Sequence, residues 1–270
     1  MTTTKPYDYL NRVSSISASS PVSYSYDGKL RRRVRWESTL VGSAWVTNQT
    51  VRYVYDGNLV IQERDGHNLA LVSYTRGNDL SGAMQGAGGI GGLLGRTDSQ
   101  SSSLYHCDGN GNVTCLIGTN QLVVARYLYD PYGNTLSASG PLADANLYRF
   151  SSKESHANSG LVYYLYRFYD PNLQRWPNRD PLGELGGVDL YTYVENNPVA
   201  KIDPTGKLSV WPCTSGEWSK CFKKCQKNGP DFICVQCIAF YQEVGIPPWI
   251  GGVIRVTLCV CYKVQCTQRS

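Results

Sequence analysis

A Tyr-Asp pair followed by a turn-forming residue recurs along the first 206 residues, and this repeat constrains the fold more than any other feature. The copies are Tyr26-Asp27-Gly28, Tyr55-Asp56-Gly57, Tyr129-Asp130-Pro131 and Tyr169-Asp170-Pro171. In residues 51–61, Asp56-Gly57 lies between two arms in which apolar and polar residues alternate. Asp-Gly readily adopts the positive φ angles of a tight hairpin turn. The repeat therefore predicts a row of β-hairpins, each contacting mainly its neighbours.

Composition divides the chain into two chemically different parts. Eight of the ten cysteines and the whole net charge of +5 lie in residues 207–270, whereas residues 1–206 are electrically balanced and contain 18 of the 20 tyrosines. We expect a mainly β fold, with an antiparallel repeat sheet over 1–207 and a small cysteine-rich α+β tail over 208–270. Because the excess charge is confined to the tail, we expect no nucleic-acid partner.

Neither a signal peptide nor a membrane span is visible in the sequence. Residues 1–20 are rich in Ser and Thr and lack an apolar core segment. The apolar stretch 80–95 is interrupted by glycines, and the stretch 246–262 is interrupted by prolines, glycines and Arg255. We expect no segment of this chain to cross a membrane as a helix.

Two local motifs favour structural interpretations. The basic run 31–35 alternates so that Arg31, Arg33 and Arg35 share one face of a strand, which predicts a solvated face rather than a binding patch. Residues 86–91 match the glycine spacing of a dinucleotide-binding loop, but no strong strand leads into them. We therefore expect no cofactor.

Two Asp-Pro-x-Gly units, Asp180-Pro181-Leu182-Gly183 and Asp203-Pro204-Thr205-Gly206, stand 23 residues apart. Asp at the first position, Pro at the second and Gly at the fourth describe a type I turn. From spacing alone, a structural role as turns is favoured over catalysis.

Two longer blocks resemble the Rhs/YD-repeat family, in particular its Rhs-associated core. The first, over 74–97, is glycine-rich, and the second, over 163–207, contains both Asp-Pro-x-Gly units. The resemblance implies that the body is part of a β-sheet that spirals into a hollow shell around the variable, often toxic, C-terminal part of the chain. It also implies export or surface association without a visible signal peptide. Further shell segments or an immunity protein would be its partners.

The same resemblance implies an intramolecular aspartyl protease that cuts one residue beyond the second Asp-Pro-x-Gly unit. Asp180 and Asp203 match the family's carboxylate pair and Arg167 its assisting arginine, which makes Lys207–Leu208 the scissile bond and the chain's own tail the substrate and cargo. Two close carboxylates do not both ionise easily, so one keeps a proton while the other acts as a base. A cut in cis needs no separate substrate pocket.

The cysteines of the tail are expected to stabilise it. Cys221 and Cys225 lie four apart in a plausible helix, and Cys259 and Cys261 lie two apart in the strand-like run 253–264. Both spacings place two sulfurs about 6–7 Å apart on one face, so two disulfides could join helix to strand. The other disulfide candidates are Cys213, Cys234, Cys237 and Cys266. Zinc bound by Cys221, Cys225, Cys234 and Cys237 is the alternative, since Cys234 and Cys237 have metal-type spacing. The third alternative is that the cysteines are reduced and lie in the core of the tail.

The sequence leaves three functions open. The chain is the end of a shell that releases its tail by proteolysis in cis, or it is a non-catalytic surface or adhesion module in which both Asp-Pro-x-Gly units are turns. In the third, the tail stays attached as a binding or zinc module.

Overall fold

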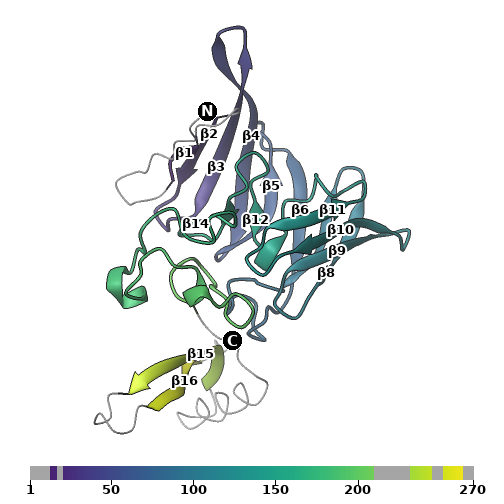
Figure 1. Ribbon diagram of the computed structural model, residues 1–270. Coiled ribbons are helices and arrows are strands. Elements are labelled where there is room, and N and C mark those ends of the chain that lie inside the picture. The colour runs from purple at the N-terminus through teal and green to yellow at the C-terminus, as the bar shows by residue number, and fades with distance from the viewer. Residues whose placement is uncertain (1–12, 17–20, 210–231, 245–251, 264–270) are drawn as a thin grey trace, which may run out of the picture.

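An 11-stranded antiparallel sheet forms most of the body, and its strands follow one another in sequence order (Figure 1). The computed structural model describes residues 13–16, 21–209, 232–244 and 252–263. The strands are β1 (Ser15–Ile16), β2 (Val22–Tyr26), β3 (Arg32–Val41), β4 (Ala44–Asp56), β5 (Leu59–Arg64), β6 (Ala70–Arg76), β7 (Leu93–Asp98), β8 (Ser102–Cys107), β9 (Val113–Gly118), β10 (Val123–Tyr129) and β11 (Thr135–Ser139). The expected mainly β, antiparallel body is confirmed, including the hairpin at Asp56-Gly57, which joins β4 to β5.

Both residues of the Tyr-Asp repeat have a defined structural task. The Asp27 carboxylate accepts hydrogen bonds from the backbone N–H groups of Lys29 and Arg31, and that of Asp130 accepts from the equivalent positions two and four residues further on. The repeat tyrosines donate from their hydroxyls to main-chain carbonyls at least 13 residues earlier in the chain. The pairs are Tyr26 with Val13, Tyr55 with Arg32, Tyr129 with Val113 and Tyr169 with Tyr132. The repeats at Asp27 and Asp130 therefore close their own turns, and each of the four tyrosines attaches its repeat to an earlier segment.

Residues 140–209 form mostly irregular structure packed against the sheet (Figure 1). They contain a small sheet of β12 (Glu154–Ser155), β13 (Val162–Tyr163) and β14 (Phe168–Tyr169), and three short 3-10 helices at Phe150–Ser152, Gly183–Gly186 and Val194–Asn196. A cluster of buried aromatic rings supplies their core: Phe150, Tyr164, Tyr169, Trp176 and Tyr193. Tyr169 and Tyr193 stack with their ring centroids 3.9 Å apart. Aromatic burial thus replaces regular secondary structure in holding this segment.

A buried ion cluster joins the small sheet to the large one. The Glu154 carboxylate on β12 pairs with Arg32 on β3 and lies 2.8 Å from Arg35 Nη1, and the Tyr53 hydroxyl donates to it. Although burial opposes ionisation, Arg32 and Arg35 hold the pKa of Glu154 below its usual value. The cluster connects residues more than 100 positions apart in the chain.

The prediction of a solvated basic face on residues 31–35 is wrong for Arg35, which is 4% exposed, and Arg32 is fully buried. The cause is a β-bulge: Ser25 pairs with Val34 but Tyr26 pairs with Arg32, so Arg33 has no partner position on β2. A bulge changes the alternation of side chains between faces, and Arg32 and Arg35 come to lie on the same inner side.

Both Asp-Pro-x-Gly units are turns, as expected. In each, the Asp side chain accepts a hydrogen bond from the backbone N–H two residues later, which belongs to Leu182 in the first turn and Thr205 in the second. Gly183 has φ +60° and Gly206 has φ +82°, values that disfavour any residue with a Cβ. The two turns differ in their surroundings, because Gly183 faces open space while Gly206 packs against Arg167 and Tyr164.

In the tail, β15 (Phe232–Val244) pairs with β16 (Gly252–Lys263) as a two-stranded antiparallel sheet. β16 coincides with the run 253–264 for which a strand is expected. The helix expected around Cys221 and Cys225 lies outside the described residues, and so do the side chains of all eight tail cysteines. The disulfide and zinc assignments therefore stay predictions. Within the described ranges, no helix has the length and apolar character needed to span a membrane.

We expect Glu154→Gln to destabilise the protein by about 3–5 kcal/mol, because it removes the carboxylate that pairs with the fully buried Arg32 and leaves the buried Arg35 with Glu37 as its remaining partner. Urea unfolding followed by intrinsic fluorescence measures the loss. Glu195→Gln is the matched control. Its pair with Lys201 involves a side chain that is 63% exposed, so its loss should stay below about 1 kcal/mol. Equal losses in the two variants would contradict the assignment.

The two turn glycines give a second stability test. Gly183→Ala should cost about 1 kcal/mol, because only backbone strain is introduced. Gly206→Ala should cost about 2–3 kcal/mol, since its Cβ would also lie 3.2 Å from the backbone nitrogen of Arg167 and 3.2 Å from Tyr164 Cβ. The same urea titrations compare the two variants with the wild type. The prediction fails if Gly183→Ala is the more damaging change.

Candidate active site

The structure brings together the three residues that the sequence assigns to catalysis. Arg167 Nη2 lies 2.7 Å from Asp180 Oδ2 and 3.7 Å from Asp203 Oδ2. All three residues are buried. Arg167 directly precedes β14, while Asp180 and Asp203 begin the two Asp-Pro-x-Gly turns. One guanidinium group therefore lies against both carboxylates.

The Arg167 side chain is held by contacts along its whole head group. Its guanidinium carbon lies 4.1 Å from the centroid of the Trp176 ring, a stacking geometry that a planar guanidinium favours. Its Nε donates to the Gly206 carbonyl and its Nη1 to the Leu190 carbonyl. Burial lowers the pKa of Arg167, and the carboxylates of Asp203 and Asp180 oppose that shift. An arginine remains protonated under such conditions and supplies a fixed positive charge.

The two oxygens of Asp203 have different tasks. Oδ1 accepts hydrogen bonds from the backbone N–H groups of Thr205, Gly206 and Lys207, at 3.0, 2.7 and 3.2 Å. Oδ2 is the oxygen nearer to Arg167. Burial raises the pKa of Asp203, and Arg167 and the three backbone hydrogen bonds only partly offset this effect. Asp203 therefore holds a proton more readily than an ordinary aspartate.

The bond expected to be cut follows this site directly. The preceding peptide group is held at both ends, because its Lys207 N–H donates to Asp203 and its Gly206 carbonyl accepts from Arg167. The Lys207 ammonium lies 3.5 Å from the centroid of the Tyr166 ring, which fixes the direction of the side chain. Leu208 is 41% exposed, so the chain leaves the protein interior at this point.

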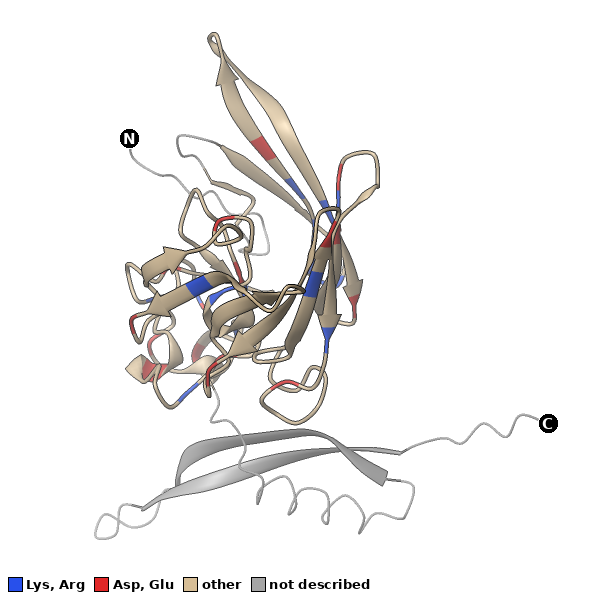
Figure 2. Ribbon diagram, turned by 90° about the vertical axis from the view of Figure 1, so that its right-hand side faces the viewer, with Lys and Arg blue, Asp and Glu red and all other residues tan. Residues whose placement is uncertain are grey.

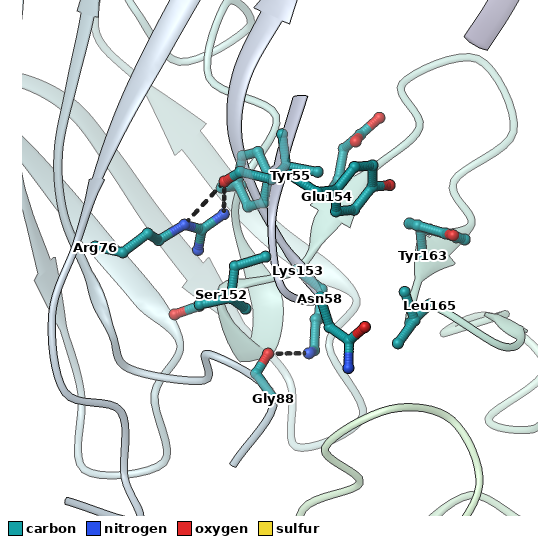
Figure 3. A pocket seen from close by; sticks show the side chains of 12 residues that line it. Tyr55, Asn58, Arg76, Gly88, Ser152, Lys153, Glu154, Tyr163 and Leu165 are labelled. Carbon is teal, nitrogen blue, oxygen red and sulfur yellow. Dashed lines mark hydrogen bonds between the residues drawn. The ribbon is translucent and has the colours of Figure 1, made fainter. Parts of the chain in front are cut away.

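Sequence reasoning missed one charged residue beside the site. The Lys153 ammonium donates to the carbonyls of Gly88 and Pro204, at 2.6 and 2.7 Å, beside a small cavity of about 40 Å³ (Figure 3). The glycine-rich block over 74–97 thus packs on the second Asp-Pro-x-Gly turn. Both elements are visible in the sequence, but no spacing links Lys153 to either. Within the described residues, no group of three or more His, Cys, Asp or Glu side chains could hold a metal ion.

Comparisons with known proteins agree with this architecture, although no family model matches. The chain is 32% identical over 213 residues to a Bacillus spizizenii protein named tRNA3(Ser)-specific nuclease WapA, a match that covers 76% of this chain and 8% of that relative. It is 40% identical over 92 residues to toxin subunit YenC1 of Yersinia entomophaga, covering 33% of this chain and 9% of the relative. The chain thus spans less than a tenth of the length of either protein.

The solved structures show the same fold. A crystal structure of TcdB2-TccC3-Cdc42 superimposes with a TM-score of 0.59 at 22% identity, over 76% of this chain and 10% of that one. With the Tyr-Asp repeats and both core blocks present in the right order, these relatives show that the chain belongs to the Rhs/YD-repeat family.

Proposed function

We propose that the body is the end of an Rhs-type shell that cuts its own chain at Lys207–Leu208 and so releases residues 208–270 as a small effector. The observation that carries the proposal is the position of Arg167, which contacts Asp180, approaches Asp203 and binds the carbonyl of Gly206, next to the bond to be cut. A charged cluster of this kind in a buried site is typical of catalytic carboxylates.

The proposed chemistry is hydrolysis in a single turnover. The Asp180 carboxylate, oriented by Arg167, takes a proton from a water molecule whose oxygen attacks the Lys207 carbonyl carbon. Asp203, which holds a proton readily, donates it to the departing nitrogen of Leu208 as the C–N bond breaks. The products are a carboxyl group on Lys207 and an amino group on Leu208. Because the substrate is covalently attached, its delivery has no entropic cost of association.

Further shell segments are the proposed partners of the body. The outer part of the β3–β4 hairpin, residues 38–49, extends beyond the neighbouring strands (Figure 1 and Figure 2). It carries exposed apolar side chains, among them Val41 at 61% and Trp45 at 49% exposure. A hairpin that carries apolar side chains and whose outer edges pair with no neighbouring strand of the described residues is a surface that another strand-rich segment can cover. Relatives many times longer than this chain fit that arrangement. Export of the protein or its association with the cell surface is part of the same proposal.

A non-catalytic surface module is the second candidate. The observation in its favour is that both Asp carboxylates cap their own turns, as Asp27 and Asp130 do in the repeats. In that case the tail stays attached as a binding or zinc module. The two candidates differ in whether residues 207 and 208 remain joined.

We expect freshly purified wild-type chain to give two fragments on a denaturing gel, with intact masses that meet at Lys207–Leu208. Asp180→Asn and Asp203→Asn should each give one intact chain, since each removes one of the two carboxylates. Asp189→Asn is the matched control, because Asp189 is exposed and lies in the same segment, and it should cleave like the wild type. An intact wild-type chain would exclude proteolysis and leave the surface-module hypothesis.

The tail is tested separately by its cysteines. If disulfides stabilise it, the tail purified under oxidising conditions should gain the mass of one hydrogen per bonded cysteine after reduction in denaturant, and unfold more easily once reduced. Metal analysis of the unreduced protein tests the zinc alternative. A full set of free thiols with no bound metal would rule out both and indicate reduced core cysteines.

A further inference from the structure

Lys153 is a buried lysine whose two described hydrogen bonds go to carbonyl oxygens. It is 8% exposed, and its ammonium bridges Gly88 on the glycine-rich block and Pro204 on the second turn. The ring of Tyr164 lies 5.4 Å from the same nitrogen. Figure 3 shows the side chain crossing toward Gly88 from the β12 side of the cavity. A buried ammonium group costs free energy to desolvate, so a lysine at this position calls for a reason.

Gly88 contacts the same Pro204 carbonyl from another direction. A Cβ at residue 88 would lie 1.9 Å from the Pro204 oxygen, and Gly88 has φ +62°. Only glycine allows so close an approach between the block and the turn. Lys153 and Gly88 together form what we call the carbonyl clamp, which fixes the residue that directly follows Asp203.

We propose that Lys153 is a positioning residue that, through the carbonyl clamp, holds the Asp203 turn and the Lys207–Leu208 bond in register with Arg167 and Asp180. The inference rests on the proposed function for its effect on cleavage, but the clamp itself is a property of the folded chain. Pro204 is three residues before Lys207, and the backbone between them is bonded to Asp203 and Arg167. A displacement of the Pro204 carbonyl therefore moves the whole reacting segment. Misplacement of a reacting bond by about 1 Å can cost about a hundredfold in rate.

The clamp also has a proton-dependent component. Burial lowers the pKa of Lys153 to about 7, while Asp203 and Asp79 act to raise it and Arg76 to lower it. As pH falls through this value the ammonium form, which donates strongly to both carbonyls, becomes the dominant one. Above pH 7 the neutral amine is a weaker donor, and the hold on Pro204 loosens.

The first experiment measures the first-order rate of cis cleavage from pH 5.5 to 9 in newly synthesised full-length chain. In the wild type, the rate should fall as pH rises through about 7. Lys153→Arg keeps the charge and should retain cleavage, with the fall in rate moved to higher pH. Lys153→Met should cleave about 10- to 100-fold more slowly at pH 6, and its rate should no longer fall as pH rises through about 7. Lys29→Met, which changes an exposed lysine, is the control. If the rate falls at the same pH in both Lys153 variants as in the wild type, the fall reports the titration of Asp203 and the proposal is overturned.

The second experiment tests Gly88, the other residue of the carbonyl clamp. Gly88→Ala should slow cleavage by a similar factor, because its Cβ displaces the Pro204 carbonyl. Gly28→Ala has no heavy atom within 4 Å of the new Cβ and should leave the rate unchanged. A wild-type rate in Gly88→Ala would contradict the clamp.

The third experiment does not depend on cleavage. In full-length chain carrying Asp180→Asn, hydrogen exchange at the amides of Thr205, Gly206 and Lys207 reports how firmly the turn is held. Adding Lys153→Met should speed exchange at these amides by at least about tenfold while leaving the repeat strands unchanged. Unchanged exchange would overturn the inference even in a chain that cleaves. Faster exchange in a chain whose wild type never cleaves would retain the clamp and reject only the proteolytic function.

Discussion

The buried pairing of Glu154 with Arg32 and Arg35 is the interaction on which the rest of the body depends. Residues 140–209 contain little regular secondary structure, so they cannot hold their own shape through backbone ladders. Breaking the buried pairing of this carboxylate with two guanidinium groups is strongly destabilising, and the pairing attaches β12 to β3 of the large sheet. The aromatic cluster around Tyr169 supplies the apolar core of the same segment.

Lys153 and Glu154 are adjacent in the chain and attach this segment to two different parts of the body. Successive side chains in extended backbone point to opposite sides, so Glu154 reaches the sheet while Lys153 reaches the glycine-rich block and the second turn. The large sheet and the turn that begins with Asp203 are thereby connected through two adjacent residues. This connection explains how a chain of irregular loops can present buried charged groups at fixed separations.

The repeat sheet could be predicted from the sequence because its determinants are local. Asp27 and Asp130 close turns within four residues of themselves, and the Asp56-Gly57 pair is by itself a hairpin signal. The inner position of Arg35 could not be predicted in the same way. It depends on a bulge in β3, where Arg33 has no partner on β2. Nothing in the alternation of residues 31–35 reveals this bulge.

The site shows the same division between local and distant determinants. Resemblance identifies Asp180, Asp203 and Arg167, but Lys153 depends on contacts 65 and 51 residues away and leaves no local pattern. The structural and catalytic interpretations of Asp203 also turn out to use different atoms. Oδ1 is saturated by three backbone N–H groups that shape the turn, which leaves Oδ2 to face Arg167. A residue can therefore be a turn cap and a proton carrier at once, and the Asp-Pro-x-Gly spacing that favours turns is no argument against catalysis.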